Sequence, residues 1–463
     1  MSEMQKTIGK SISFSGAGIH TGVATKMTLK PAEENTGIRF IRVDLDNHPE
    51  IKADVTNVFA TERSTSLRKG DAKIHTVEHI LAAITGAKID NIIIEVDNVE
   101  IPILDGSAKR FSEKIEEAGL ITQNAKREYF EIKRPIIFTD EETGSKLAAT
   151  PSDYYEIDVE INYNSRILGI QHATLNTVSD FKTEIASSRT FCFLHELEEL
   201  IDNNLVKGGD INNAIVIVEN KLSNKKLIEL KKVFNNPKIK VSKSGYLNNL
   251  TLRHKNEAAR HKLLDIVGDL SLVGRPIKGK ITALKPGHKN NTKFAKKLKE
   301  IMMQQVSETV PEINFKEAPL YNKERIKKIL PHRDPFLFID EIREIGEDFI
   351  IGVKFVRADE EYFKGHFPDE PVMPGVLQLE TMAQTGGVLI LSTVPNPEDY
   401  LTFFMKIEDA RFKQKVVPGD TIIFRLNLIS PIRRGLCHMR GVGFVNGKIV
   451  VEANLLAKIA PKK

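Results

Sequence analysis

Apolar and polar residues alternate along much of the chain, with the period of two that is typical of half-buried strands. Between residues 6 and 43 glycine-rich breaks interrupt this alternation, which predicts a set of antiparallel strands. The apolar run at 91–96 predicts a buried strand. Further strands are expected at 129–138, 155–163, 214–218 and 277–284.

Other segments carry the apolar spacing of helices. The clearest is 107–118, where Ser107 is suited to cap the first turn and Gly119 follows the last turn. The remaining helices are expected at 76–83, at 183–200, around 260–269, and in a lysine-rich segment that ends near residue 306.

Sheet-forming segments followed by two helices occur twice in succession. We therefore predict a duplicated α+β architecture, with a first repeat at 1–126 and a second repeat at 127–306. The short apolar strands at 91–94 and 213–216 are expected to occupy corresponding places in the two repeats.

The C-terminal third follows a different pattern. Residues 307–319 contain two prolines and no clear period, which predicts a linker. A long apolar helix is expected at 376–391, with strands before and after it, and turn signals stand at 418–420 and 446–447. One helix in a mostly antiparallel sheet is thus predicted for 320–463.

Composition narrows the class of protein. The chain has 463 residues, of which 41% are hydrophobic and 28% charged, as in ordinary globular proteins. No apolar run approaches the ~18 residues that span a bilayer, and the N-terminus lacks the apolar block of a signal peptide. We therefore expect no transmembrane segment and a cytoplasmic location. The two cysteines, Cys192 and Cys437, lie outside any CxxC pattern, which argues against a disulfide framework and a thiolate metal site.

The charge balance argues against a nucleic-acid partner. The formal net charge is only +5, and the aromatic residues are not interleaved with basic ones. Basic residues gather locally at 289–299, 411–415 and 433–434. Such runs are usually solvated surface, although an acidic partner is compatible with them.

The segment 260–269 is the first candidate for chemistry. His261 and Asp265 stand four residues apart in a helical pattern, so both project from the same face. Two interpretations are open: a ligand pair for a divalent metal, or an ion pair on a helix. His254 stands in a similar tripeptide but has Ala258 four residues on, so chelation from one face favours His261.

A second candidate lies at 75–79, which has the HxxEH form. In that motif two histidines bind zinc and the glutamate acts as base, so His75 and His79 would be the ligand pair. Alternatively, His79 alone joins the pair on 260–269 and leaves one position open for water, as expected of catalytic zinc. Both interpretations place Glu78 beside the reacting water.

Eight motifs, taken in chain order, closely resemble those of the zinc-dependent UDP-3-O-acyl-N-acetylglucosamine deacetylases of lipid A biosynthesis. The resemblance runs from the N-terminus to about residue 300. The motifs are GIHTG at 18–22, TVEH at 76–79, DNIIIEV at 90–96, IPILDGS at 101–107, SRTF at 188–191, KGG at 207–209, RHKLLDIVGD at 260–269 and GH at 287–288.

The resemblance implies one zinc ion per chain. His79, His261 and Asp265 would be its ligands, and His75 and His254 would be bystanders. The implied substrate is a UDP-linked acylated glucosamine, and the implied reaction is metal-dependent hydrolysis of its N-acetyl group.

Further roles follow from the same resemblance. Glu78 would act as general base toward the attacking water, and His288 as general acid for the leaving amine, with Asp269 orienting His288. Lys262 and Thr190 would stabilise the developing oxyanion.

Three other residues near these motifs have weaker assignments. Phe191 and Phe193 either line a hydrophobic passage for the substrate or belong to ordinary core. His20, in the turn at 18–22, is expected to be held by the backbone and not to bind the metal.

Glu380 and His366 suggest a second chemistry. Glu380 lies in a helix that is otherwise apolar enough to be buried, where a carboxylate is costly unless it is paired. Alternatively, it belongs to a polar stripe on the helix surface. His366 stands in a Gly-His-Phe-Pro turn, where an exposed loop histidine is the alternative. Together the two residues suggest an acid–base pair.

The motifs LPHRDPF at 330–336, GHFP at 365–368 and PGVLQLE at 374–380 look like those of the (3R)-hydroxyacyl-[acyl-carrier-protein] dehydratases, which have a hot-dog fold. This resemblance covers about residues 320–463. It implies that His366 removes the α-proton of a 3-hydroxyacyl thioester and that Glu380 protonates the departing hydroxyl. Gly375, at a helix N-terminus, would donate its N–H to the thioester carbonyl.

The implied partners follow. In these dehydratases the histidine and the glutamate of one site come from different subunits, so a homo-oligomer built from hot-dog dimers is implied. The acyl-carrier protein is acidic, which gives the basic clusters at 411–415 and 433–434 a possible docking role. Two alternatives remain for the C-terminal module: a thioesterase of the same fold, or a non-catalytic oligomerisation or carrier-docking domain. The combined prediction is a bifunctional hydrolase and hydro-lyase.

Overall fold

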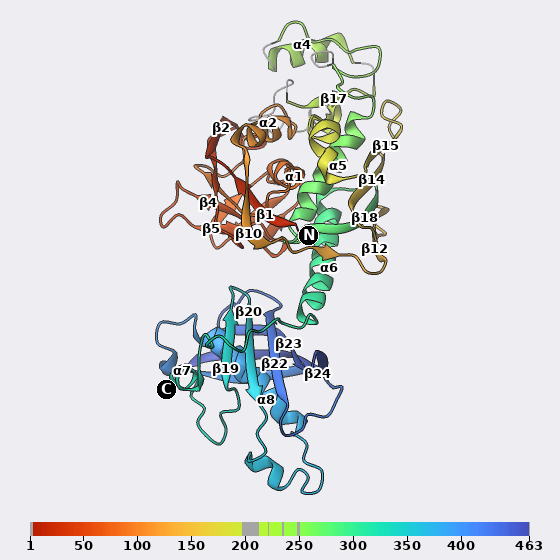
Figure 1. Cartoon of the computed structure of the whole chain (residues 1–463). Helices are drawn as coiled ribbons and strands as arrows, with labels where there is room; N and C mark the ends of the chain where they lie inside the picture. Colours follow the sequence, from red (N-terminus) through yellow and green to blue (C-terminus); the bar gives the residue numbers. More distant parts are fainter. Residues whose placement is uncertain (1–2, 197–212, 221, 234–235, 248–250, 463) are drawn as a thin grey trace. The chain divides into compact units, whose positions relative to one another are not determined.

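The computed structural model describes residues 3–196, 213–220, 222–233, 236–247 and 251–462 (Figure 1). The chain forms two compact units, Met1–Lys299 and Glu300–Lys463. The motif at 207–209 and the last residues of the helix predicted at 183–200 lie outside the described residues. In the described ranges no helix is long and apolar enough to cross a membrane.

The first unit contains a five-stranded sheet with the order β2-β3-β9-β4-β5. Its last strand in sequence, β9, lies in the middle, antiparallel to β3 and parallel to β4. Such a central position suits a strand whose isoleucines are mostly buried. The strands are β2 (Ile12–Ala17), β3 (Ala24–Pro31), β4 (Ile38–Arg42), β5 (Glu50–Lys52) and β9 (Ile92–Val96).

A second sheet repeats this arrangement, with the order β12-β13-β18-β14-β15. Here β18 is the central strand, antiparallel to β13 and parallel to β14. The identical topology confirms the predicted duplication of the α+β unit. The strands are β12 (Ile136–Asp140), β13 (Ser145–Thr150), β14 (Tyr155–Asn162), β15 (Ile170–Leu175) and β18 (Ile277–Leu284), and β11 (Phe130–Glu131) also pairs with β18.

The predicted correspondence between 91–94 and 213–216 is wrong, because β18 occupies the place of β9. Residues Ile215–Ile217 instead form β17, which pairs in parallel with β16 (Phe191–Phe193) in a separate two-stranded sheet. The prediction of a helix at 183–200 is therefore also wrong, because Phe191–Phe193 in its middle form a strand. A single π-helical turn, Phe181–Ile185, precedes β16, and the main chain of Thr190 accepts a hydrogen bond from the Ile215 N–H.

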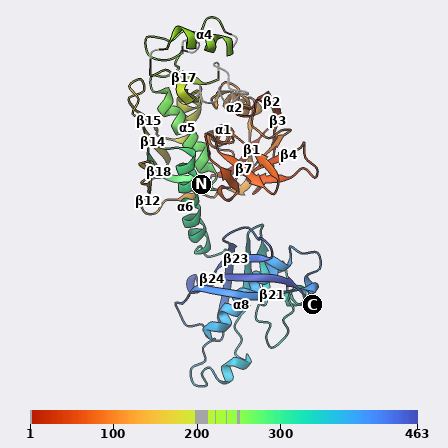
Figure 2. The same cartoon turned by 180° about the vertical axis from the view of Figure 1, so that it is seen from behind.

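Three helices carry motif residues of the first unit: α1 (Glu78–Gly86), α5 (Glu257–Ser271) and α6 (His288–Ser307). Helix α2 (Lys109–Ala118) follows the motif at 101–107. Helix α1 packs against α5, and α5 also contacts β14 and β15. In Figures 1 and 2 α1 and α5 lie between these two sheets. Residues 78–84 of α1 are all buried, as expected of a helix that is covered on several sides.

The remaining elements of the first unit were mostly not predicted. Strand β10 (Leu120–Lys126) follows the Gly119 turn and pairs with β1 (Met4–Ile8). The strand predicted at 129–138 is divided into β11 and β12, with Pro135, which has no N–H to donate, between them. The others are β6 (Val58–Ala60), β7 (Ser66–Lys69), β8 (Ala72–Ile74) and α4 (Asn224–Val233).

The second unit is one antiparallel six-stranded sheet with the order β19-β20-β22-β23-β24-β21, and helix α8 packs on it. This is the predicted hot-dog arrangement. Asn446 and Gly447 both have positive φ, as the predicted tight turn between β23 and β24 requires. The elements are α7 (Lys323–Ile329), β19 (Glu341–Ile345), β20 (Phe349–Phe355), α8 (Gly375–Leu391), β21 (Tyr400–Phe412), β22 (Thr421–Leu428), β23 (Leu436–Val445) and β24 (Lys448–Pro461).

Helix α8 lies close to its sheet because glycines stand at the contacts. A Cβ at Gly386 would lie 2.8 Å from the sulfur of Met439, and a Cβ at Gly441 would lie 2.3 Å from the sulfur of Met382. Large and small residues thus interlock across the helix–sheet interface. The buried core of this unit includes Met382, Leu426 and Met439.

Candidate active sites

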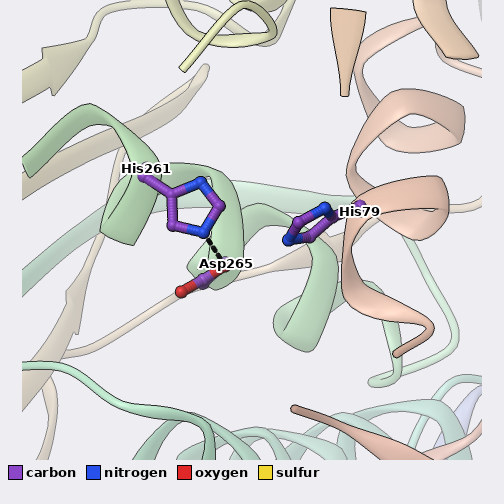
Figure 3. Close-up of side chains that lie close together, drawn as sticks. All are labelled: His79, His261 and Asp265. Atoms are coloured by element: carbon purple, nitrogen blue, oxygen red, sulfur yellow. Dashed lines mark ion pairs between the residues drawn. The ribbon is translucent and has the colours of Figure 1, made fainter. Parts of the chain in front are cut away.

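Three buried side chains converge where α1 meets α5. His79 comes from α1, whereas His261 and Asp265 come from α5, and each offers a ligand atom within 4.8 Å of the others. Figure 3 shows the two imidazole rings and the carboxylate turned toward one another. The ring centroids are 5.1 Å apart, and His261 Nε2 lies 3.4 Å from Asp265 Oδ1. Two histidines and one carboxylate in this arrangement are a suitable ligand set for a divalent metal.

The hydrogen bonds of these residues test whether a metal ion fits. His261 Nδ1 lies 3.1 Å from the Ser188 carbonyl oxygen, which can only accept, so Nδ1 carries the proton and Nε2 presents a lone pair. In the described part of the chain, His79 Nδ1 and Asp265 Oδ1 are buried without a hydrogen-bond partner. Such unpaired polar atoms are costly unless something else binds them. The residues therefore fit a metal ion.

Burial and neighbouring charges strongly shift the pKa values in this cluster. Burial, reinforced by His261, lowers the pKa of His79 to about 3, so His79 is neutral at pH 7. Burial also lowers the pKa of His261. For Asp265, burial raises the pKa, but Lys262 and the neighbouring histidines outweigh burial and hold it below its usual range. Neutral imidazoles and an ionised carboxylate are the forms that bind metals.

Glu78 and His288 are two further buried titratable side chains beside this cluster. Their closest atoms, Glu78 Oε1 and His288 Nε2, are 3.9 Å apart, and both side chains are buried. Burial raises the pKa of Glu78 to about 7. Burial alone would lower the pKa of His288, but Asp269, Asp265 and Glu78 outweigh it and raise the pKa to about 9. At neutral pH the glutamate can therefore exchange a proton while the histidine holds one.

Asp269 contacts His288, the residue that the family resemblance expects it to orient. Its Oδ2 lies 3.0 Å from His288 Nδ1 and also accepts a hydrogen bond from Asn291 Nδ2. The sequence analysis missed Thr65, whose N–H donates to Glu78 and whose hydroxyl donates to Asp269. No motif contains Thr65. Asn291 had a weak signal, since it stands three residues after His288 on α6.

The other predicted residues lie around the same cluster. Lys262 Nζ is 2.8 Å from Asp265 Oδ2 and 5.6 Å from the ring centroid of Phe191. Phe191 in turn lies 6.4 Å from His261, and Tyr163, which the sequence analysis did not single out, contacts both Phe191 and Phe193. Phe193 is buried, as expected of core, whereas Phe191 is half-buried.

The remaining histidines near the motifs have other partners. His75 Nδ1 lies 2.8 Å from the Ser66 hydroxyl, and His254 Nε2 lies 3.0 Å from the Ser187 hydroxyl. The main-chain N–H of His20 donates to Glu100. Neither His75 nor His254 belongs to the converging group formed by the two motif helices.

The second unit holds a cavity between α8 and its sheet. Its polar lining includes Glu380, Gln384 and His332, and its apolar lining includes Leu426 and Met439. Gln384 Nε2 lies 3.0 Å from Glu380 Oε1, so the carboxylate is paired as burial requires. The predicted alternative of a surface stripe does not describe Glu380, whose side chain is only 20% exposed.

His366 is half-buried, and its Nδ1 lies 2.8 Å from the Val372 carbonyl oxygen. Among the described residues it does not line the cavity that Glu380 lines. Gly375 begins α8, and a Cβ there would lie 2.7 Å from the ring of Phe412. A larger residue at this position would require the Phe412 ring to move.

Comparisons with known proteins match each unit to a protein family. A family model described as UDP-3-O-acyl N-acetylglycosamine deacetylase matches residues 5–239 and 232–300, and a model of the FabA-like domain matches residues 330–454. The bifunctional enzyme LpxC/FabZ of Bacteroides thetaiotaomicron is 46% identical over 460 residues, which cover 99% of each chain. The chain belongs to the bifunctional LpxC/FabZ family. It is thus a hydrolase and a hydro-lyase in one polypeptide.

Two further curated proteins support this assignment. The bifunctional enzyme LpxC/FabZ of Porphyromonas gingivalis is 44% identical over 461 residues, which cover 100% of each chain. The UDP-3-O-acyl-N-acetylglucosamine deacetylase of Helicobacter hepaticus is 39% identical over 295 residues, 64% of this chain and 89% of that protein. A solved dehydratase heterocomplex, ApeI:P of Xenorhabdus doucetiae, matches 30% of this chain and 91% of that chain, with 18% identity and a TM-score of 0.27.

Proposed function

We propose that the first unit hydrolyses the N-acetyl group of a UDP-3-O-(3-hydroxyacyl)-N-acetylglucosamine, with one zinc ion per chain held by His79, His261 and Asp265. The observation that carries this proposal is the convergence of three buried ligand atoms, of which His79 Nδ1 and Asp265 Oδ1 lack hydrogen-bond partners in the described chain. Zinc, when bound there, supplies Lewis-acid activation of water and of the amide carbonyl.

The protein side chains then divide the proton transfers. Glu78, with a pKa raised to about 7 by burial, takes a proton from the attacking water. Burial alone would lower the pKa of His288, but Asp269 outweighs burial and keeps the ring protonated. His288 then gives a proton to the leaving amine. Lys262 and Thr190 stabilise the negative charge that develops on the carbonyl oxygen. The location of Lys262 beside Asp265 puts its cation at the edge of the proposed metal site.

Metal content tests the ligand set. Full-length His79→Ala and His261→Ala should each lose nearly all bound zinc, because each removes one of three protein ligands. His75→Ala, which instead removes a hydrogen bond to Ser66, should retain zinc and is the matched control. Elemental analysis of the purified proteins measures the zinc-to-chain ratio. Loss of zinc in His75→Ala, or retention of zinc in His79→Ala, would contradict the proposed ligand set.

For the second unit we propose dehydration of (3R)-hydroxyacyl-acyl-carrier protein to the trans-2-enoyl product. His366 takes the α-proton, and Glu380 gives a proton to the departing hydroxyl, which leaves as water. The Gly375 N–H, at the start of α8, faces the thioester carbonyl and stabilises its developing charge. The paired but partly exposed carboxyl of Glu380 in an apolar cavity supports this assignment.

A homo-oligomer built from hot-dog dimers is part of the proposal. Within one chain His366 does not line the cavity of Glu380, so we infer that the histidine of each site comes from a second subunit. The edge strand β21 supports this inference because it exposes large apolar side chains. Phe403 is 52% exposed, Met405 57% and Phe412 50%. An apolar, otherwise uncovered edge is typical of a surface that another chain covers.

Complementation tests both the chemistry and the shared site. His366→Ala and Glu380→Gln chains should each lose dehydration, followed by enoyl absorbance. Co-expressed, they should regain about one quarter of wild-type activity, because half of random dimers are mixed and each mixed dimer has one intact site. No recovery would contradict a site shared between subunits. Unchanged activity of His366→Ala would favour a non-catalytic domain, and release of free thiol without enoyl product would favour a thioesterase.

Two further assignments belong to this proposal. The acidic acyl-carrier protein docks near Arg411 and Lys413, whose side chains are 68% and 43% exposed. We also propose a cytoplasmic location, in keeping with the free thiols of Cys192 and Cys437.

A further inference from the structure

Two side chains beside Glu380 have no role in the chemistry described so far. Gln384 and His332 both line the same cavity as Glu380. Gln384 stands one helical turn after Glu380 on α8, and His332 comes from the loop after α7. Both place a nitrogen near the same carboxylate oxygen, Oε1 of Glu380.

The orientation of the Gln384 amide is determined by the main chain. Its Oε1 accepts a hydrogen bond of 2.8 Å from the Phe338 N–H, and its Nε2 donates one of 2.8 Å to the Phe336 carbonyl oxygen. In a flipped amide the NH2 group would face the Phe338 N–H, donor against donor. The amide oxygen would face the Phe336 carbonyl oxygen, acceptor against acceptor. The group that faces Glu380 Oε1 is therefore an N–H donor.

His332 places a second nitrogen near the same oxygen. Its Nε2 lies 3.5 Å from Glu380 Oε1, its ring stacks on Phe336, and its Nδ1 is buried without a partner in the described chain. Burial, aided by Arg333, lowers the pKa of His332 against the opposing effect of Glu380, so the ring is neutral at pH 7. In the tautomer with its proton on Nε2, the N–H faces Oε1 and the unpartnered Nδ1 carries only a lone pair. This tautomer costs less than the other one, which would bury an unpaired N–H at Nδ1.

We infer that Gln384 and His332 are positioning residues of the dehydratase, which hold Oε1 of Glu380 with two N–H donors so that the transferable proton lies on Oε2. This inference rests on the proposed role of Glu380 as the acid. As the C–O bond breaks, its electron pair stays with the departing oxygen, which takes the Oε2 proton and leaves as water. Glu380 becomes a carboxylate, and the two donors stabilise the new charge.

Variants at position 332 separate donation from packing. His332→Phe keeps a ring that can stack on Phe336 but has no donor, whereas His332→Gln has an N–H of similar reach. With full-length protein and an acyl-carrier substrate, His332→Phe should lower kcat roughly 10- to 100-fold with KM changed by less than about threefold. His332→Gln should restore most of kcat. Gln384→Met, which also removes a donor, should lower kcat in the same way.

A histidine elsewhere on the sheet provides the matched control. His438 Nε2 lies 3.9 Å from Glu408 Oε2, a comparable His–Glu pair. It stands on β23 between Cys437 and Met439, which both line the cavity, so His438 points to the opposite face of the sheet. His438→Phe should leave kcat and KM unchanged.

The outcomes distinguish this inference from the proposed function. If Glu380→Gln is inactive while His332→Phe and Gln384→Met keep wild-type kcat, the positioning role is overturned and the proposed acid stands. If Glu380→Gln stays active, the proposed acid fails and the inference fails with it. If His332→Gln is as slow as His332→Phe, or if KM rises at constant kcat, the residue lines the cavity and does not act through its N–H.

Discussion

Glu257 and Arg189 show how a single buried ion pair links two motifs. Their side chains are 1% and 5% exposed, and the guanidinium Nε lies 2.9 Å from the carboxylate. The Arg253 N–H donates to the same carboxylate, and the Arg189 guanidinium also donates to the Thr251 carbonyl oxygen. Burial raises the pKa of Glu257, but these donors outweigh it and hold the pKa below the usual range. The pair therefore ties the segment before β16 to the start of α5, which carries His261.

The pH dependence of stability follows from that pKa. Because the folded state has the lower pKa, the stabilisation is present above the unfolded value of about 4.3 and is lost as the pH falls through the folded value. Glu257→Gln should lower the unfolding free energy by about 3 kcal/mol at pH 7, since Arg189 is left buried without its partner charge. Urea unfolding at several pH values should show this difference shrinking in acid.

A surface pair supplies the control for this prediction. Glu113 lies 3.7 Å from Lys109 on α2, and both side chains are about half exposed. Glu113→Gln should change stability by less than about 0.5 kcal/mol at any pH. A difference between wild type and Glu257→Gln that stays constant from pH 7 into acid would contradict the linkage argument.

At the scale of elements, the crossing of α1 and α5 positions the three proposed metal ligands. A Cβ at Gly268 would lie 2.1 Å from the main-chain oxygen of Glu78, so the helices can approach only because this residue is glycine. The close approach brings His79 on α1 to the two ligands on α5. The sequence contains Gly268 inside a helical pattern, but it does not say which helix lies against it.

Gly268→Ala should therefore affect stability and metal binding together. The new methyl group meets backbone, which cannot rotate away, so α1 and α5 must separate at a cost of about 1–3 kcal/mol. Thermal unfolding and zinc content of the full-length protein measure both effects. Gly386→Ala on α8, whose methyl would meet the flexible side chain of Met439, should cost less. Wild-type zinc content and stability in Gly268→Ala would contradict the proposed geometry.

The same scale shows where local patterns mislead. The segment 183–200 has helical spacing, yet Phe191–Phe193 forms β16 because its main chain pairs with β17. Conversely, α5, α8 and β9 match their predicted places within a few residues, since their apolar patterns are long or continuous. The secondary structure of short segments depends on their tertiary partners, whereas that of long, strongly patterned segments can be predicted from their own sequence.

At the scale of the whole molecule, the proposed docking of an acidic acyl-carrier protein requires a basic surface on the second unit. Arg411 and Lys413 flank the buried Glu452, at 3.6 Å and 3.0 Å, and both reach solvent. Glu452 neutralises part of their charge, and Glu308 lies 3.4 Å from Arg440, but the three basic groups outnumber these two carboxylates. The local balance is therefore positive, as docking of an acidic partner requires.

Replacing Arg411 and Lys413 together by glutamine tests this docking role. Glutamine removes both charges but can still donate a hydrogen bond to Glu452, so the fold should be retained. KM for the carrier-bound substrate should rise roughly threefold to tenfold, and KM for a small thioester should not change. The difference should shrink at high salt, because screening weakens exposed charges. Equal effects on both substrates would contradict docking at this surface.

The sequence by itself determined the duplicated α+β unit, the separate C-terminal module and the motifs of both sites, because these depend on local pattern. The two enzyme types followed from the family resemblance that those motifs carry. The sequence left open whether His75 or the pair His261 and Asp265 would join His79, and only the resemblance chose between them. Tertiary structure decided which side chains converge, since α1 and α5 are far apart in sequence and meet only when the two sheets enclose them. It also added Thr65 and His332, whose partners no spacing reveals, because a hydrogen bond depends on where the chain returns in space.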